Sequence, residues 1–329
     1  MKRRDFIAVL GGAAAAWPLA ASAQQAERMR RIGVLLPYAE IDRESQARIA
    51  AFREAMQRLG WTEGRNVRIE YRWSAGDPAR DKADAEELVR SAPDVIVATG
   101  GRALAEAQRL TSTIPIVFTQ VSDPVGSGFV AGLARPGGNI TGFQIFEPAM
   151  GGKWLGLLKE AAPNMRRVAV LFGSDVVSNK AFLRTANALA PSLDVEVNSV
   201  DIRGGVQIEH AIATFASQPD GGLVVVPHPT LVADRASIIV LAARHRLPAI
   251  YPYRFFATEG GLISYGPDQV EQWRWAATYV DRILRGEKSG ALPVQAPTKY
   301  ELGINLKTAK ALGLEVSPML LARADEVIE

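Results

Sequence analysis

Polar and glycine residues that could contact a small molecule stand directly after short apolar runs of this chain. Such runs predict buried strands of parallel sheets, and ligands bind outside the carboxyl ends of those strands. The sequence therefore predicts a ligand site where these strands end. The candidate contacts are Tyr38, Thr99, Gly100, Gly101, Thr119, Gln120, Ser122, Asp123, Ser174, Asp175, His228 and Tyr251.

These candidate groups favour an amino acid as the ligand. Backbone N–H groups at the helix starts after Gly101 and Ser174 can bind a carboxylate. Asp123 or Asp175 can hold an ammonium group, and aromatic candidates can stack on an aromatic or branched side chain. A sugar usually requires more Asn, Asp and Arg than these loops contain, and a polyanion requires more Arg.

Two of the candidates have a second interpretation. Asp123 is the first candidate for the ammonium group, but the dipeptide Asp123-Pro124 also favours a turn. His228 stands at the end of a predicted strand, where it is either a ligand contact or a polar residue of a solvated loop. A general base without an evident partner is a weaker interpretation than both.

Sequence signatures of catalysis are missing. No GxGxxG follows a strand, and neither GxxxxGK[ST] nor GxSxG occurs. The chain has no Cys, which excludes thiolate chemistry, and only three His, which disfavours a histidine-rich metal site. We therefore expect no catalytic residue, metal or cofactor, and a protein that is not an enzyme.

The N-terminus has the features of an export signal. Three cations precede an apolar stretch at 6–21, and small residues flank position 22 in the form that signal peptidase accepts. Residues 3–7 resemble a twin-arginine signal, although Ala8 stands where a lysine is often found. We expect residues 1–23 to be removed and the mature chain to be soluble and periplasmic. The alternatives are the general secretory route and a retained membrane anchor.

The composition indicates a globular chain of about two domains. It has 329 residues, of which 48% are hydrophobic and 22% charged. The formal net charge is +3, and no basic block is long enough to follow a nucleic-acid backbone. We therefore expect no nucleic-acid partner.

The two halves of the chain repeat one pattern. The apolar runs at 30–37, 94–100 and 114–118 correspond, in the same order, to those at 166–173, 222–228 and 247–251. Helical patterns lie between the strands, which predicts an α/β fold: two similar doubly wound parallel-sheet lobes joined by a hinge. We expect residues 30–142 and about 259–290 in the first lobe and 143–258 in the second. The sequence does not assign residues 291–329 to either lobe.

Several motifs together carry a family resemblance. The segments 59–67, 122–125, 135–142, 260–266 and 304–314 resemble the ABC transporter substrate-binding protein family that includes the tryptophan/tyrosine-type TrpX proteins. The resemblance implies a two-lobed type I periplasmic binding protein, here expected to be a monomer. Such a protein delivers a small solute to an ABC permease and its ATPase. The alternatives are a ligand-binding sensor partner of a membrane receptor and a periplasmic enzyme.

Overall fold

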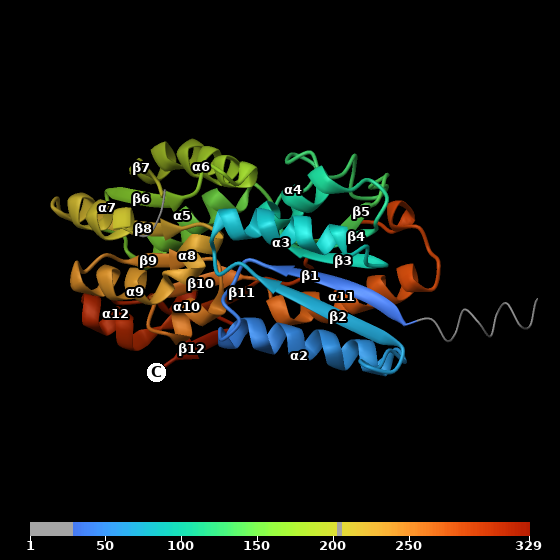
Figure 1. Ribbon diagram of the computed structural model, residues 1–329. Helices are drawn as coiled ribbons and strands as arrows, with labels where there is room; N and C mark the ends of the chain where they lie inside the picture. The colour runs from blue at the N-terminus through green and yellow to red at the C-terminus, as the bar shows by residue number, and fades with distance from the viewer. Residues whose placement is uncertain (1–28, 203–205) are drawn as a thin grey trace, which may run out of the picture.

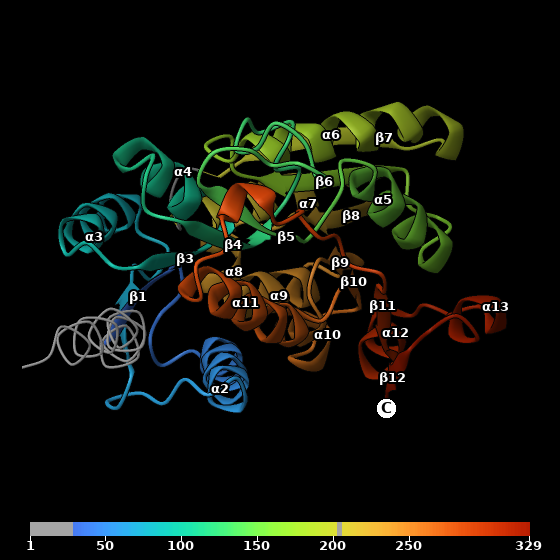
Figure 2. The ribbon, with the colours of Figure 1, turned by 90° about the vertical axis from the view of Figure 1, so that its right-hand side faces the viewer.

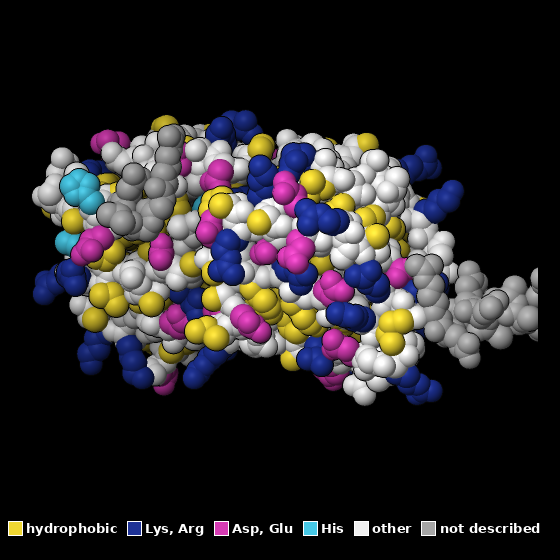
Figure 3. Space-filling model, in the orientation of Figure 1, with side chains coloured by type: hydrophobic (Ala, Val, Ile, Leu, Met, Phe, Trp, Pro, Cys, Tyr) yellow, Lys and Arg dark blue, Asp and Glu magenta, His cyan; other side chains and the backbone are white. Residues whose placement is uncertain are grey.

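The computed structural model describes residues 29–202 and 206–329, which form two α/β lobes lying side by side (Figure 1). The predicted signal peptide, residues 1–23, lies outside the described residues. Within them, no helix is both long and apolar enough to cross a membrane. On the face in Figure 3, basic and acidic side chains are interspersed and form no continuous basic track.

The first lobe is built on a parallel sheet with the strand order β2-β1-β3-β4-β5. Helices α2 and α11 pack together on one face, and α3 packs against α4 on the other (Figure 2). The elements are β1 (Arg30–Leu36), α2 (Arg43–Arg58), β2 (Val67–Trp73), α3 (Pro78–Arg90), β3 (Val95–Thr99), α4 (Gly100–Leu110), β4 (Ile116–Val121), β5 (Ile140–Gln144) and α11 (Gln269–Leu284).

The second lobe has a wider sheet with the order β12-β11-β10-β9-β8-β6-β7, in which only β10 and β11 are antiparallel. Its strands are β6 (Arg167–Phe172), β7 (Glu196–Asp201), β8 (Gly221–Val225), β9 (Ala249–Tyr251), β10 (Ile263–Gly266), β11 (Glu301–Asn305) and β12 (Glu326–Ile328). Its helices are α5 (Met150–Ala161), α6 (Val177–Leu189), η1 (Ala190–Leu193), α7 (Val206–Ala216), α8 (Pro229–Ala233), α9 (Arg235–Arg244), α10 (Arg254–Thr258), α12 (Leu306–Leu312) and α13 (Pro318–Leu321).

The predicted fold class is confirmed by the strand orders. The order β7-β6-β8-β9-β10 in the second lobe repeats β2-β1-β3-β4-β5 in the first. Both are the doubly wound order whose binding crevice lies at the carboxyl ends of the strands. The carboxyl ends of both sheets therefore supply the loops that could form a site.

The position of β10 corrects the expected lobe boundary. Residues 259–290 were expected to return to the first lobe, but β10 pairs with β9 and β11 in the second. It is the fifth strand of the repeat, the counterpart of β5, and only α11 after it crosses to the first lobe. There α11 buries Trp273, Ala276 and Val280.

The C-terminal segment is divided between the lobes. The short helix η2 (Ser289–Ala291) contacts β5 in the first lobe, whereas β11 and β12 extend the sheet of the second. Together with the passages from β5 to α5 and from β10 to α11, the chain crosses between the lobes three times. Several crossing segments of this kind form a hinge.

Candidate ligand-binding site

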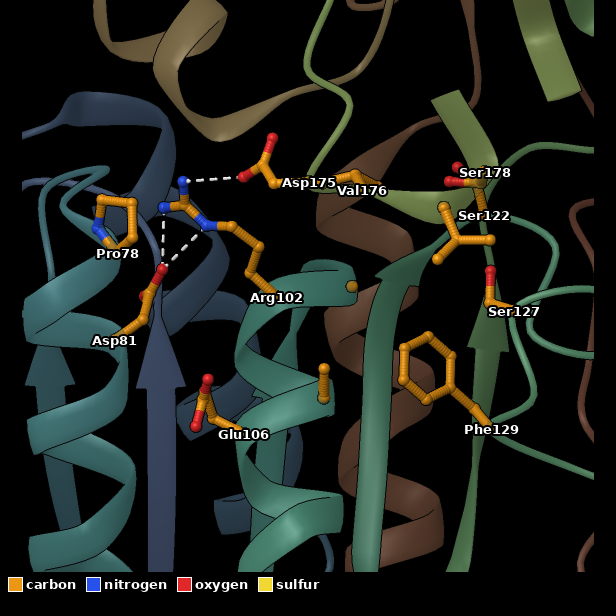
Figure 4. A pocket seen from close by; sticks show the side chains of 13 residues that line it. Pro78, Asp81, Arg102, Glu106, Ser122, Ser127, Phe129, Asp175, Val176 and Ser178 are labelled. Atoms are coloured by element: carbon orange, nitrogen blue, oxygen red, sulfur yellow. Dashed lines mark hydrogen bonds and ion pairs between the residues drawn. The ribbon is translucent and has the colours of Figure 1, made fainter. Parts of the chain in front are cut away.

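A cavity of about 260 Å³ lies between the two lobes, at the carboxyl ends of their strands. The first lobe contributes the start of α3, the start of α4 and the loop after β4, and the second lobe contributes the loop from β6 to α6. The lining residues are Pro78, Asp81, Gly101, Arg102, Ala105, Glu106, Ser122, Ser127, Phe129, Asp175, Val176, Val177 and Ser178 (Figure 4).

One end of the cavity is formed by a buried ion pair of the first lobe. The Arg102 guanidinium donates to Asp81, with Nε–Oδ2 2.9 Å and Nη2–Oδ2 2.7 Å, and to the carbonyl of Gly76 at 2.8 Å. The two side chains are 9% and 4% exposed. Burial raises the pKa of Asp81, although the positive charge of Arg102 opposes the rise. Arg102 is therefore held rigidly, with Nη1 left to face the second lobe.

Asp175 of the second lobe faces Arg102 across the cavity (Figure 4). Its Oδ2 lies 3.5 Å from Arg102 Nη1, and its Oδ1 lies 3.0 Å from His228 Nε2. His228 Nδ1 accepts the backbone N–H of Thr230, so the ring proton is on Nε2 and donates to Asp175. Burial acts to raise the pKa of Asp175, but the His228 hydrogen bond and the positive charge of Arg102 outweigh it and lower the pKa to about 2. Asp175 is thus an ionised carboxylate, and its side chain is 45% exposed.

The starts of two helices from opposite lobes also meet at the cavity. Gly101 in the first turn of α4 approaches Val176, the residue before α6. Neither helix has a side-chain cap at its N-terminus. First-turn N–H groups of both helices are therefore available to an anion, and both helix dipoles favour negative charge there.

The other end of the cavity is less polar. The Phe129 ring lies beside the hydroxyl-bearing residues Ser122 and Ser127, and Val176 and Ala105 add apolar surface. The cavity therefore has a charged end and an aromatic end. This arrangement suits a small molecule with both charged groups and an apolar part.

Three of the candidates from the sequence line this cavity: Gly101, Ser122 and Asp175. His228 does not line the cavity, but its ring is hydrogen-bonded to Asp175, which does. His228 is also the N-cap of α8. Gly100 precedes Gly101 with a φ of +78°, a backbone conformation that glycine adopts readily.

Four other candidates lie buried beneath the loops and bond to one another. The Tyr38 hydroxyl donates to Gln120 Oε1 at 2.7 Å, and Thr119 Oγ1 donates to Thr99 Oγ1 at 3.2 Å. Burial raises the pKa of Tyr38, which keeps the hydroxyl protonated as a donor. The Thr99–Thr119 pair joins the neighbouring strands β3 and β4, and the Tyr38–Gln120 pair joins the segment after β1 to β4 on the far side of β3.

Three candidates serve local structure. Ser174 donates from its N–H and hydroxyl to Asp201 at the end of β7. Tyr251 stacks on Phe256 in the core, 4.8 Å between ring centroids, and is 1% exposed. Asp123 is outside the cavity lining, and its Oδ1 accepts the Gly126 N–H at 3.0 Å. The turn interpretation of Asp123 fits this geometry better than ligand binding.

The candidates from the sequence did not include Arg102, Asp81 and Phe129, which also line the cavity. Arg102 directly follows the candidates Thr99 to Gly101, so extending the strand-end rule by one residue finds it. Asp81 and Phe129 lie in α3 and in the loop after β4, away from any strand end. Only the packing of α3 on α4 and the course of that loop bring them to the site.

The comparisons with known proteins agree with this architecture. A family model described as ABC transporter substrate binding protein matches residues 40–328. A protein of Clostridioides difficile named as tyrosine-binding is 25% identical over 292 residues, 88% of this chain and 82% of the relative.

Two solved structures match over 91% of this chain and all of theirs. One is described as an ABC domain from Streptococcus pneumonia in complex with L-Trp, with a TM-score of 0.84 and 22% identity. The other is a conserved domain protein of Vibrio cholerae, with a TM-score of 0.85 and 25% identity.

Proposed function

Because the chain belongs to the ABC transporter substrate binding protein family, we propose that it binds an aromatic amino acid between its lobes and delivers it to an ABC importer. The ligand class is suggested by the tyrosine-binding relative and by the structurally similar protein that holds L-Trp. The observation that carries the proposal is the cavity between the lobes, with its charged end and its aromatic end.

The groups around the cavity match the parts of an amino acid. The carboxylate would accept N–H groups from the starts of α4 and α6, with the positive Arg102 nearby. The ammonium would bind Asp175, whose ionised and half-exposed carboxylate has room for another donor. The aromatic side chain would lie against Phe129 at the other end.

A binding assay on the purified protein without residues 1–23 tests the ligand class. Isothermal titration calorimetry would compare L-tyrosine, L-tryptophan and L-phenylalanine with L-leucine, L-glutamate and glucose. We expect the aromatic amino acids to bind most tightly and the sugar not to bind. Tightest binding of L-glutamate or glucose would contradict the proposed ligand class.

Closure of the lobes around the ligand is the second part of the proposal. The lobes share a hinge of three crossings, and the cavity walls come from both, so the ligand would bridge them. Small-angle X-ray scattering should show a smaller radius of gyration once a tight ligand is bound. An unchanged radius with such a ligand would exclude closure.

We also propose that the chain acts in the periplasm, as a monomer that meets a permease and its ATPase. N-terminal sequencing of periplasmic material should find a start near Gln24. Replacement of Arg3 and Arg4 by Lys should block export by the twin-arginine route, and unaffected export would indicate the general secretory route. The family binds solutes, so we expect the bound amino acid to be recovered chemically unchanged.

A further inference from the structure

Arg48, in α2 of the first lobe, is a buried cation where the two lobes meet. Its side chain is 1% exposed. The guanidinium carbon lies 4.9 Å from the ring centre of Tyr38 in its own lobe and 5.9 Å from that of Phe255 in the second lobe. Nη2 donates to Gln269 Oε1, whereas Nε and Nη1 have no hydrogen-bond partner among the residues that the structure describes.

This burial depends on the second lobe. Phe255 belongs to α10, which packs on β9, β10 and β11 of that lobe. An opening motion that draws α10 away from α2 would remove Phe255 from Arg48 and let water reach the guanidinium. Dehydrating a charge is costly unless it is paired. The Asp42 carboxylate is near enough to attract Arg48 but forms no ion pair with it, and cation–π contacts return only part of the cost. Closing the lobes therefore has an unfavourable contribution from Arg48.

An ion pair at the same contact acts in the opposite direction. Arg235 of the second lobe reaches Asp42 of the first, with 2.8 Å between Nη2 and Oδ1. Arg235 is also held within its own lobe by Glu259, at 3.0 Å. The bond to Asp42 is thus the one that closure adds, and it favours the closed form.

We propose that Arg48 opposes closure of the lobes and that the Arg235–Asp42 ion pair favours closure. The balance between these two contributions would then affect the affinity for a ligand, although none of these side chains contacts the ligand. The inference rests on the proposed function only in that closure traps a ligand. None of the three residues lines the cavity. For a ligand that binds the closed form, the affinity becomes weaker as the fraction of molecules able to close becomes smaller.

Scattering on the ligand-free protein tests the inference without any knowledge of the ligand. Arg48→Met removes the charge and keeps a long apolar side chain, and Arg48→Gln is a second neutral variant if Met fails to fold. Asp42→Asn removes the ion pair but keeps a good helix cap. We expect the radius of gyration to increase in the order Arg48→Met, wild type, Asp42→Asn. Glu209→Gln, which removes an exposed ion pair within the second lobe, should match the wild type.

Ligand release gives a second readout if an amino acid binds. We expect L-tyrosine or L-tryptophan to dissociate about tenfold more slowly from Arg48→Met than from the wild type. A radius of folded Arg48→Met equal to or above that of the wild type would overturn the inference. Failure of every amino acid to bind would instead count against the proposed function and leave the scattering result standing.

Discussion

Arg102 of the first lobe and Asp175 of the second form an ion pair across the cleft, with 3.5 Å between Nη1 and Oδ2. Each charge is fixed within its own lobe, Arg102 by Asp81 and Asp175 by His228. The two lobes therefore present opposite charges in fixed positions before they meet. A ligand between them encounters a preorganised site, which reduces the entropy lost on binding.

Asp175→Asn should weaken the binding of an aromatic amino acid by about 30-fold, because truncating one partner of a desolvated charge pair costs about 2–5 kcal/mol. Calorimetry with L-tyrosine measures the loss. Glu209→Gln, remote from the cavity in the same lobe, is the control.

A ligand analogue separates an ammonium contact from an effect on closure. The compound 3-(4-hydroxyphenyl)propionate keeps the ring and carboxylate of tyrosine but lacks the ammonium group. Its affinity should be nearly equal for the wild type and Asp175→Asn. Equal losses for tyrosine and the analogue would show that Asp175 acts only through Arg102 and closure.

The low pKa of Asp175 predicts an acid-dependent loss of stability. Its pKa is about 2 in the folded chain against an ordinary value of 3.8, so its stabilising contribution is present above about pH 4. That contribution is lost as the pH falls from about 4 to about 2. Between pH 5 and pH 3, the wild type should lose about 0.5 kcal/mol more unfolding free energy than Asp175→Asn, which is roughly half of the full linkage value because the Asp175 side chain is partly exposed and screened by solvent.

Urea denaturation at the two pH values measures this difference. The raised pKa of Asp81 acts in the opposite direction but is present in both proteins. It therefore contributes little to the comparison. Parallel losses in wild type and Asp175→Asn would contradict the role assigned to the His228 hydrogen bond.

Much of the fold could be predicted because the sequence of each lobe contains continuous apolar runs, typical of buried strands, separated by helical patterns. The limit is shown by β10 and α11, which are neighbours in the sequence but lie in different lobes. Strand pairing of β10 with β11 is decided by contacts between distant segments, and no local pattern carries that information. The same limit applies to Asp81, whose place in the site depends on Arg102 reaching it from the next helix.

The strand ends indicate the edge of each sheet at which the cavity lies, but they do not give the direction of each side chain. Tyr251 and Asp175 both lie at that edge, yet Tyr251 points into the core and Asp175 into the cavity. Tyr251 is the last residue of β9, where successive side chains point to opposite faces and a shift of one residue reverses the direction. Asp175 lies in the loop after β6, where no strand periodicity sets its direction. The sequence alone does not determine where the last residue of the strand falls.

The motif at 135–142 is explained by packing, and this leads to a prediction for Gly142. A Cβ on Gly142 would overlap the backbone of Phe118 in the adjacent strand β4. Thr141 Oγ1 donates to the carbonyl of Leu292 at 2.6 Å, which fastens the same strand to the crossing segment. We expect Gly142→Ala to lower the unfolding free energy by about 3 kcal/mol.

Gly128→Ala is the matched control for this change. Gly142 has a φ of +154° and Gly128 a φ of +77°, but at Gly128 no atom lies within 4 Å of the added Cβ. Its substitution should cost about 1 kcal/mol from backbone strain alone. Equal losses in the two variants, measured by urea denaturation, would show that contact with β4 is not the cause.

Asp123 has the geometry of the turn, which is one of its two interpretations from the sequence. It has a φ of +45°, its N–H donates to the carbonyl of Phe146, and its carbonyl accepts the N–H of Ser127. The carboxylate accepts the Gly126 N–H and completes the turn. Asp123→Ala should therefore lower the unfolding free energy by about 1–2 kcal/mol, since alanine is strained at this φ and leaves that N–H without its acceptor.

The companion variant Asp123→Asn separates the shape of the turn from its charge. Asparagine tolerates the left-handed conformation and keeps an oxygen acceptor, so it preserves the turn while removing the negative charge. We expect its melting temperature and its affinity for L-tyrosine to stay close to those of the wild type. A loss of affinity of tenfold or more in Asp123→Asn, with an unchanged melting temperature, would indicate that Asp123 binds the ammonium group of the ligand. In that case Asp175→Asn should retain nearly full affinity, because a single ammonium group needs only one of the two carboxylates.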